Sequence, residues 1–129
     1  MPEAEWHRST PQETFALFQR AAECDDVDAA YETLSSESRR RLSRSDFTDA
    51  WSYAGDTIRA LRFTTFASLE DEPGQARPTR RATFRYGTHA VSLPMVQEGH
   101  LWLFVYPTPY HDEDELRGIL EAIESEAEG

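Results

Sequence analysis

The stretch RATFRYGTHAVSLPMVQEGHLWLFVY, residues 81–106, decides the fold of this chain. Apolar and polar residues alternate through it, and a period of two is typical of strands with one buried face. Gly87-Thr88 and Glu98-Gly99 stand where two-residue hairpin turns belong. The stretch therefore predicts a meander of three antiparallel strands, over residues 79–86, 89–97 and 100–106.

These turns also predict which residues share a face, because the register sets the alternation. The first turn pairs Tyr86 with His89, and the second pairs Met95 with Trp102. The face that must meet the helices then holds Ala82, Phe84, Tyr86, His89, Val91, Leu93, Met95, Trp102, Phe104 and Tyr106. The opposite face is polar at one end and apolar at the other, through Val96, Leu101, Leu103 and Val105.

Amphipathic helices are predicted before the meander. Thr10-Pro11-Gln12-Glu13 has the pattern of a capping box with proline at the first helical position. Asp25-Asp26 provides candidate caps for a second helix, and Ser35-Ser36 caps a polar turn. Ser45 is the predicted cap of a third helix, which is expected to end at Gly55.

The segments that flank the meander complete the expected element order. Residues 57–68 are predicted to form a further strand, with an unclear phase near Thr64-Thr65, and residues 70–78 a loop. Asp112 is expected to begin a last helix. Its apolar stripe consists of Leu116, Ile119, Leu120 and Ile123.

Composition disfavours several classes of partner. The 129 residues carry a formal charge of -11, all 13 basic residues are arginine, and the acidic excess is concentrated after His111. Such a surface disfavours nucleic acid and membrane surfaces. Cys24 is alone, so no internal disulfide can form. The first residues lack a signal-peptide pattern, which predicts a cytoplasmic protein unless an export leader has been removed.

Three stretches resemble the nuclear transport factor 2-like superfamily in its small bacterial members. Thr10–Phe18 is similar to their opening helix, Asp25–Glu37 to their second helix and the following turn, and Leu93–Trp102 to their late hairpin. The resemblance implies an α+β cone that begins with helices, in which a curved antiparallel sheet packs on the N-terminal helices. The C-terminal helix predicted from Asp112 lies outside the common pattern of the family and is expected as an extra element. The expected organisation is a flexible N-terminus at 1–9, the cone domain at 10–110 and an acidic C-terminal helix at 111–129.

The resemblance also implies a pocket at the wide end of the cone. Six residues are its candidates: Tyr31, Trp51, Tyr86, His89, Trp102 and Tyr106. Large aromatic side chains with polar tips are typical of small-molecule sites. Simple packing of large side chains in the core is the alternative interpretation and the favoured one.

Candidate chemistry is sparse. The predicted inner face contains no Asp or Glu, so the carboxylates of the isomerase branch have no counterpart there and no catalytic residue is assigned. His89 beside Tyr86 could act as a general base, although a hydrogen-bonded structural histidine is the favoured interpretation. The four histidines do not share metal-ligand spacing, so neither a metal nor another cofactor is predicted. Arg39, Arg40, Arg41 and Arg44 could bind an anion, but they are interpreted as a solvated face, because consecutive helical positions do not converge.

These patterns predict a non-catalytic domain that binds an apolar small molecule or another protein, and that forms a homodimer through the outer face of its last strands. One alternative is an enzyme that acts on an apolar small molecule with His89 and Tyr86, similar to an isomerase or a cyclase. The other is an acidic inhibitor or immunity-type protein that binds a basic partner.

Overall fold

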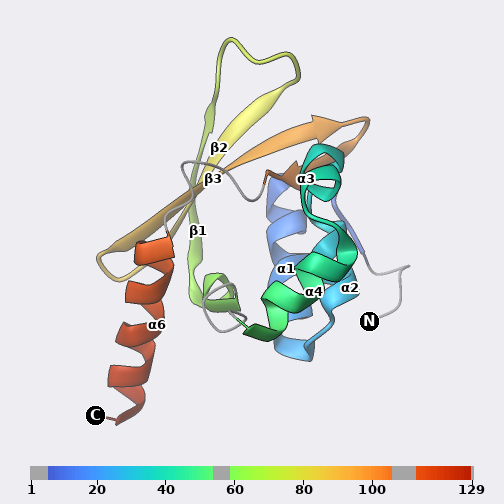
Figure 1. The fold of residues 1–129 in the computed structure, drawn as a ribbon. Coiled ribbons are helices and arrows are strands. Elements are labelled where there is room, and N and C mark those ends of the chain that lie inside the picture. Colours follow the sequence, from blue (N-terminus) through green and yellow to red (C-terminus); the bar gives the residue numbers. More distant parts are fainter. Residues whose placement is uncertain (1–5, 54–58, 106–112, 129) are drawn as a thin grey trace.

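The computed structural model describes residues 6–53, 59–105 and 113–128, and it has the predicted α+β architecture (Figure 1). The helices are α1 (Pro11–Cys24), α2 (Val27–Glu32), α3 (Ser36–Arg41), α4 (Arg44–Tyr53) and α6 (Glu113–Glu128). A 3-10 turn, η2, spans Ala60–Phe63. The strands are β1 (Thr65–Asp71), β2 (Thr79–Tyr86), β3 (His89–Glu98) and β4 (Leu101–Phe104), and they form one antiparallel sheet in the order β1-β2-β3-β4.

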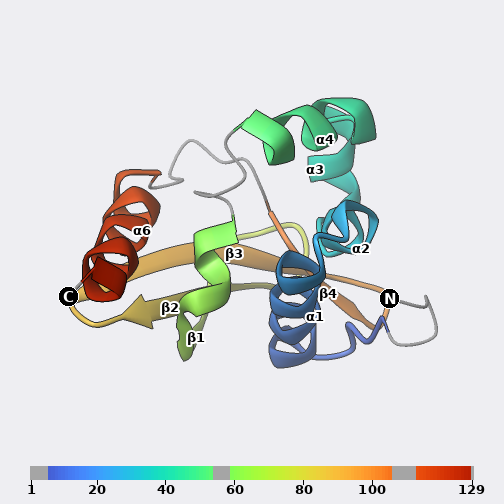
Figure 2. The same cartoon turned by 90° about the horizontal axis from the view of Figure 1, so that it is seen from below.

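Helices α1 to α4 gather over one end of the sheet and α6 lies at the other end, with η2 between them (Figures 1 and 2). The tips of the β1–β2 and β3–β4 hairpins diverge at the end opposite the β2–β3 turn (Figure 1).

The inner face of the sheet meets α1 through aromatic rings. Phe15 stacks on Phe84 with ring centroids 4.5 Å apart, and Phe84 lies edge-on to Phe66 and Phe104. The phase predicted for the strands is therefore confirmed.

Side chains cap most helices as predicted. Thr10 accepts a hydrogen bond from the amide of Glu13, and Asp26 and Ser35 cap α2 and α3 in the same way. The prediction for α4 was wrong by two positions: Ser43, and not Ser45, accepts from the amide of Asp46, at 3.2 Å. The predicted end of α4 at Gly55 and the predicted start of α6 at Asp112 lie outside the described residues.

The register of the first hairpin is confirmed, with Tyr86 opposite His89. The second register was wrong by two residues, since Met95 pairs with Phe104 and Gln97 with Trp102. The turn is Gly99-His100, and Gly99 takes a φ of 63° at its first position. Glycine adopts this left-handed conformation without the steric cost that a glutamate would meet there. A shift of two keeps every side chain on its predicted face.

Residues 60–63 do not belong to a strand, in contrast to the prediction for 57–68. They form η2, which buries Ala60 and Leu61 against the core. Two side chains satisfy the carbonyls of this turn: Gln19 donates to the carbonyl of Arg62 at 2.9 Å, and Thr64 donates to that of Leu61 at 2.7 Å. Strand β1 begins only at Thr65, where the sequence phase was unclear.

The free edge of β4 is covered by two segments from the N-terminal half. The backbone of Phe104 exchanges hydrogen bonds of 2.8 Å with Thr33 and Ser35, and the amide of Trp102 donates to the carbonyl of Arg8 at 2.8 Å. Arg8 is therefore held against the sheet, although the sequence predicts a flexible N-terminus through residue 9.

Helix α6 packs on the inner face of the sheet. Leu116 and Ile119 are buried in the same core cluster as Val91. A Cβ atom at Gly118 would lie 2.9 Å from Cε1 of His89, which shows how closely the helix approaches β3. The C-terminal helix therefore does not cover the outer face of β3 and β4.

Candidate functional site

The six candidate pocket residues do not meet in one place. Tyr31 and Trp51 are both buried, and each packs against Phe47, with ring centroids 5.5 and 5.8 Å apart. The hydroxyl of Tyr31 lies 2.9 Å from the carbonyl of Leu42 and 3.1 Å from that of Arg39. The chain thus supplies acceptors for this hydroxyl, and no ligand is required for it.

The other candidates lie at opposite ends of β3. His89 begins this strand opposite Tyr86, whereas Trp102 pairs with Gln97. Eight residues of a strand span about 26 Å, so His89 and Trp102 cannot line one small-molecule pocket. Tyr106 lies outside the described residues.

A carboxylate that the sequence analysis missed reaches Tyr86. The hydroxyl of Tyr86 donates to Oε2 of Glu126 on α6. This hydrogen bond, followed by desolvation, raises the pKa of Tyr86. The signal was available in principle, because Glu126 follows Ile119 and Ile123 at helical spacing on the same side of α6. A tyrosine with a raised pKa stays protonated at neutral pH, which makes it a poor base.

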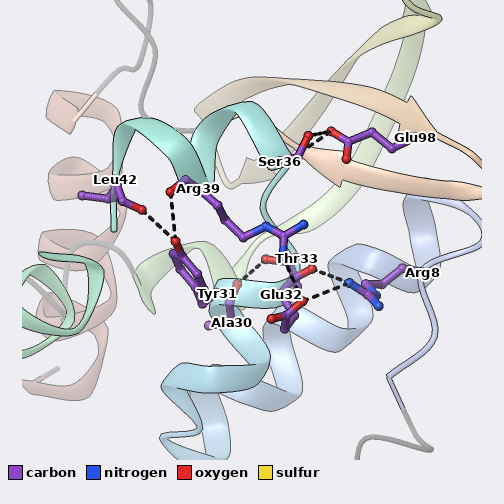
Figure 3. A network of polar contacts seen from close by, with 9 residues as sticks. All are labelled: Arg8, Ala30, Tyr31, Glu32, Thr33, Ser36, Arg39, Leu42 and Glu98. Carbon is purple, nitrogen blue, oxygen red and sulfur yellow. Dashed lines mark hydrogen bonds and ion pairs between the residues drawn. The ribbon is translucent and has the colours of Figure 1, made fainter. Parts of the chain in front are cut away.

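A polar cluster surrounds Glu32, at the end of α2 (Figure 3). Nη1 of Arg39 lies 3.2 Å from Oε2 of Glu32, and Nη1 of Arg8 lies 3.6 Å from the same oxygen. Arg8 also donates to the backbone carbonyl of Glu32 at 2.7 Å. We name these three residues the Glu32 cluster. Three separate segments bring them together: the residues before α1, the end of α2, and α3.

Arg39 does not lie on the solvated face that was predicted for the arginine run. Arg41 and Arg44 stay on the exposed surface and pair with Glu37 and Asp28. Arg39 instead turns towards α2 and is only 30 % exposed. Nothing in the sequence pattern singles it out, because its partner Glu32 precedes α3 and the second arginine lies 24 residues further back, at Arg8.

A second polar contact joins α3 to the sheet. Oε2 of Glu98 accepts hydrogen bonds from the amide and the hydroxyl of Ser36, at 3.0 and 3.1 Å (Figure 3). Nη1 of Arg77 lies 3.4 Å from the same oxygen. A carboxylate from β3 therefore stabilises the first turn of α3.

A hollow of about 450 Å³ lies beside Trp51 and is lined by Ala22, Asp25, Trp51, Ser52 and Arg59. The indole of Trp51 donates to Asp25 at 2.7 Å, and the guanidinium of Arg59 lies 5.1 Å from the ring centroid. Asp25 holds its carboxylate there from a left-handed backbone, with a φ of 54°. These contacts fix the orientation of Trp51.

A second hollow, of about 420 Å³, opens between the diverging hairpins. Trp102 forms part of its floor, and the guanidinium of Arg80 lies 5.1 Å from the centroid of that ring. Arg80 also pairs with Asp71 at 3.1 Å, so its charge is matched.

Within residues 6–53, 59–105 and 113–128, no group of three or more His, Cys, Asp or Glu side chains is arranged to hold a metal ion. In the same ranges, no helix has the length and apolar character needed to cross a membrane.

Comparisons of the chain with family models, with curated proteins and with solved structures give no match.

Proposed function

We propose that the protein is a non-catalytic interaction domain of the nuclear transport factor 2-like type, which binds another protein surface and not a small molecule inside the cone. The observation that supports this proposal most is the position of α6. This helix covers His89 and places Leu116 and Ile119 in the core, where an open cone would leave apolar surface for a ligand.

The polar groups of the candidate pocket residues also favour an interaction domain, because the chain itself supplies their partners. The hydroxyls of Tyr31 and Tyr86 and the indole of Trp51 each have a partner within the chain. A pocket that recognises an apolar ligand normally keeps a few polar groups free to orient it. A thermal-shift screen of hydrophobic metabolites should therefore give no stabiliser, and a hit that Tyr86→Phe weakens would contradict the proposal.

The enzymatic alternative depends on His89 and Tyr86. The raised pKa of Tyr86 argues against this tyrosine as a base, since its proton is held by Glu126. Turnover of any metabolite at a rate that falls in His89→Ala would establish the enzyme and exclude the interaction domain.

The first partner that we propose is a second copy of this chain. Val96, Leu101 and Val105 are half-buried on the outer face of β3 and β4, next to the fully buried Leu103. Strands with apolar residues on both faces are normally covered on both, and α6 lies on the inner side. The proposed homodimer pairs these outer faces.

Light scattering tests this assembly. The wild type should have the mass of a dimer, and Val105→Asp should lower it, because a charge would be buried at the interface. Thr65→Asp is the matched control, since it adds the same charge to an exposed position on the polar part of the outer face. A wild type that stays monomeric at high concentration contradicts the homodimer. Leu103 is unsuitable for this test because it is fully buried within one chain.

An acidic inhibitor that binds a basic partner is the second candidate. The exposed side of α6 carries Glu121 and Glu124, while its apolar side faces the core. Such a surface attracts a basic protein over long range at low salt. A pull-down from low salt that is lost at high salt and in Glu121→Gln would favour this candidate over the homodimer.

A further inference from the structure

The Glu32 cluster has more positive than negative charge. Arg8 and Arg39 share the single carboxylate of Glu32, and within the described residues neither arginine has another acidic partner. The side chains of Arg8, Glu32 and Arg39 are 18 %, 28 % and 30 % exposed, so water screens their charges only in part. The cluster therefore carries one unmatched positive charge at a partly enclosed position.

In the other ion pairs of the described chain, each carboxylate is paired with one arginine. Five exposed arginines each have a carboxylate within 4 Å that no second arginine shares. They are Arg41 with Glu37, Arg44 with Asp28, Arg77 with Glu98, Arg80 with Asp71 and Arg81 with Glu72. An unmatched guanidinium is notable in a protein with a formal charge of -11, because acidic partners are abundant.

Unpaired donors concentrate at the same place. Among the described residues, three buried side-chain nitrogens lack an acceptor: Nε1 of Trp6, Nε of Arg8 and Nε of Arg39. Two of the three belong to the Glu32 cluster, and Trp6 lies two residues before Arg8. A buried donor without an acceptor is unfavourable, and such groups commonly indicate an ion or water that completes the hydrogen bonds.

We propose that the Glu32 cluster is a binding site for a small carboxylate. A carboxylate accepts two parallel N–H bonds from a guanidinium, so its two oxygens match the donor geometry of Arg8 and Arg39. Its single negative charge neutralises the cluster, whereas a phosphate dianion would leave an excess negative charge beside Glu32. The ligand enters at the exposed part of the two guanidinium groups, and the segment of Trp6 to Arg8 adjusts so that the buried Nε donors gain acceptors.

Nuclear magnetic resonance of the arginine Nε–Hε groups in the intact protein tests this site, with acetate as the probe. At constant ionic strength, acetate should shift the resonances of Arg8 and Arg39 with saturation, and leave that of Arg41 unchanged. Chloride should have no such effect, and phosphate should bind more weakly than acetate. Shifts of similar size at all arginines, without saturation, would overturn the proposal.

Substitutions that should change acetate binding in opposite directions provide a second test. Arg39→Gln should weaken acetate binding by roughly tenfold or more, the range for a lost charged hydrogen bond. Arg41→Gln, on the same helix, should leave it unchanged. Glu32→Gln should strengthen binding, because the carboxylate that competes with acetate is removed. A purely structural cluster predicts no saturable binding in any of these variants. If a variant fails to fold by circular dichroism, the wild-type titration decides alone.

Discussion

The two ends of the sheet differ in how their polar groups are balanced. At the β2–β3 turn, Tyr86 donates to Glu126, and Gly118 lets α6 approach His89 closely. At the β4 edge, two arginines compete for Glu32 and their Nε donors have no acceptor. The first end is completed by packing within the chain, whereas the second keeps an unmatched positive charge and two Nε donors without an acceptor. Two of the six predicted pocket residues, Tyr86 and His89, lie at the first end, whereas the unmatched positive charge lies at the second.

The largest expected effect comes from removing a core contact of α6. Ile119 is fully buried, so Ile119→Ala should lower the free energy of unfolding by about 2–5 kcal/mol. This is a large part of a typical domain stability of roughly 5–15 kcal/mol. Urea melts should show the loss in one cooperative transition, and Glu121→Ala, on the exposed side of α6, should change stability by less than about 0.5 kcal/mol. Equal, small effects of both substitutions would mean that α6 does not close the cone.

A smaller effect is expected at the Glu32 cluster. Glu32→Gln leaves two partly buried arginines without their carboxylate, and should cost about 1–2 kcal/mol after allowance for solvent screening. Glu37→Gln is the matched control, because it removes the exposed partner of Arg41 and should cost less than about 0.5 kcal/mol. If the two variants have the same stability, the Glu32 cluster is an ordinary surface ion pair.

The smallest effect is expected from the hydrogen bond between Tyr86 and Glu126. Because this bond raises the pKa of Tyr86 in the folded state, it stabilises the fold below the ordinary tyrosine pKa of about 10. That stabilisation is lost as the pH rises through the raised pKa. Spectrophotometric titration of the phenol should show a lower Tyr86 pKa in Glu126→Gln than in the wild type, with Tyr86→Phe identifying the signal. An unchanged titration would mean that α6 does not reach Tyr86 in solution.

Local sequence signals predicted the structure correctly where only one backbone arrangement agreed with them. Gly87-Thr88 and the alternation around it predicted the β2–β3 register, and Thr10-Pro11 predicted the start of α1. The second hairpin had two acceptable turns that differ by one residue. The structure takes the turn with Gly99 first, which leaves Glu98 in the strand to bind Ser36, 62 residues earlier in the chain.

Long-range contacts also explain the remaining differences between the predicted and the observed structure. Residues 60–63 have the composition of a strand, but Gln19 and the core stabilise them as η2. The Glu32 cluster left no periodic signal either, because Arg8 precedes the first helix and Arg39 belongs to a run of arginines that looks like a solvated face. Such sites depend on tertiary packing and not on a local pattern.

Native-state amide hydrogen exchange of the full chain tests most directly whether α6 is an integral part of the closed cone. The amides around Leu116 to Ile123 should exchange with the same free energy of opening as those of Val91 to Leu93 in β3, because the two elements share one core. Fast exchange throughout α6, with β3 still protected, would show that the helix is detached. The cone would then be open, and the proposed interaction domain would be contradicted in favour of a small-molecule pocket.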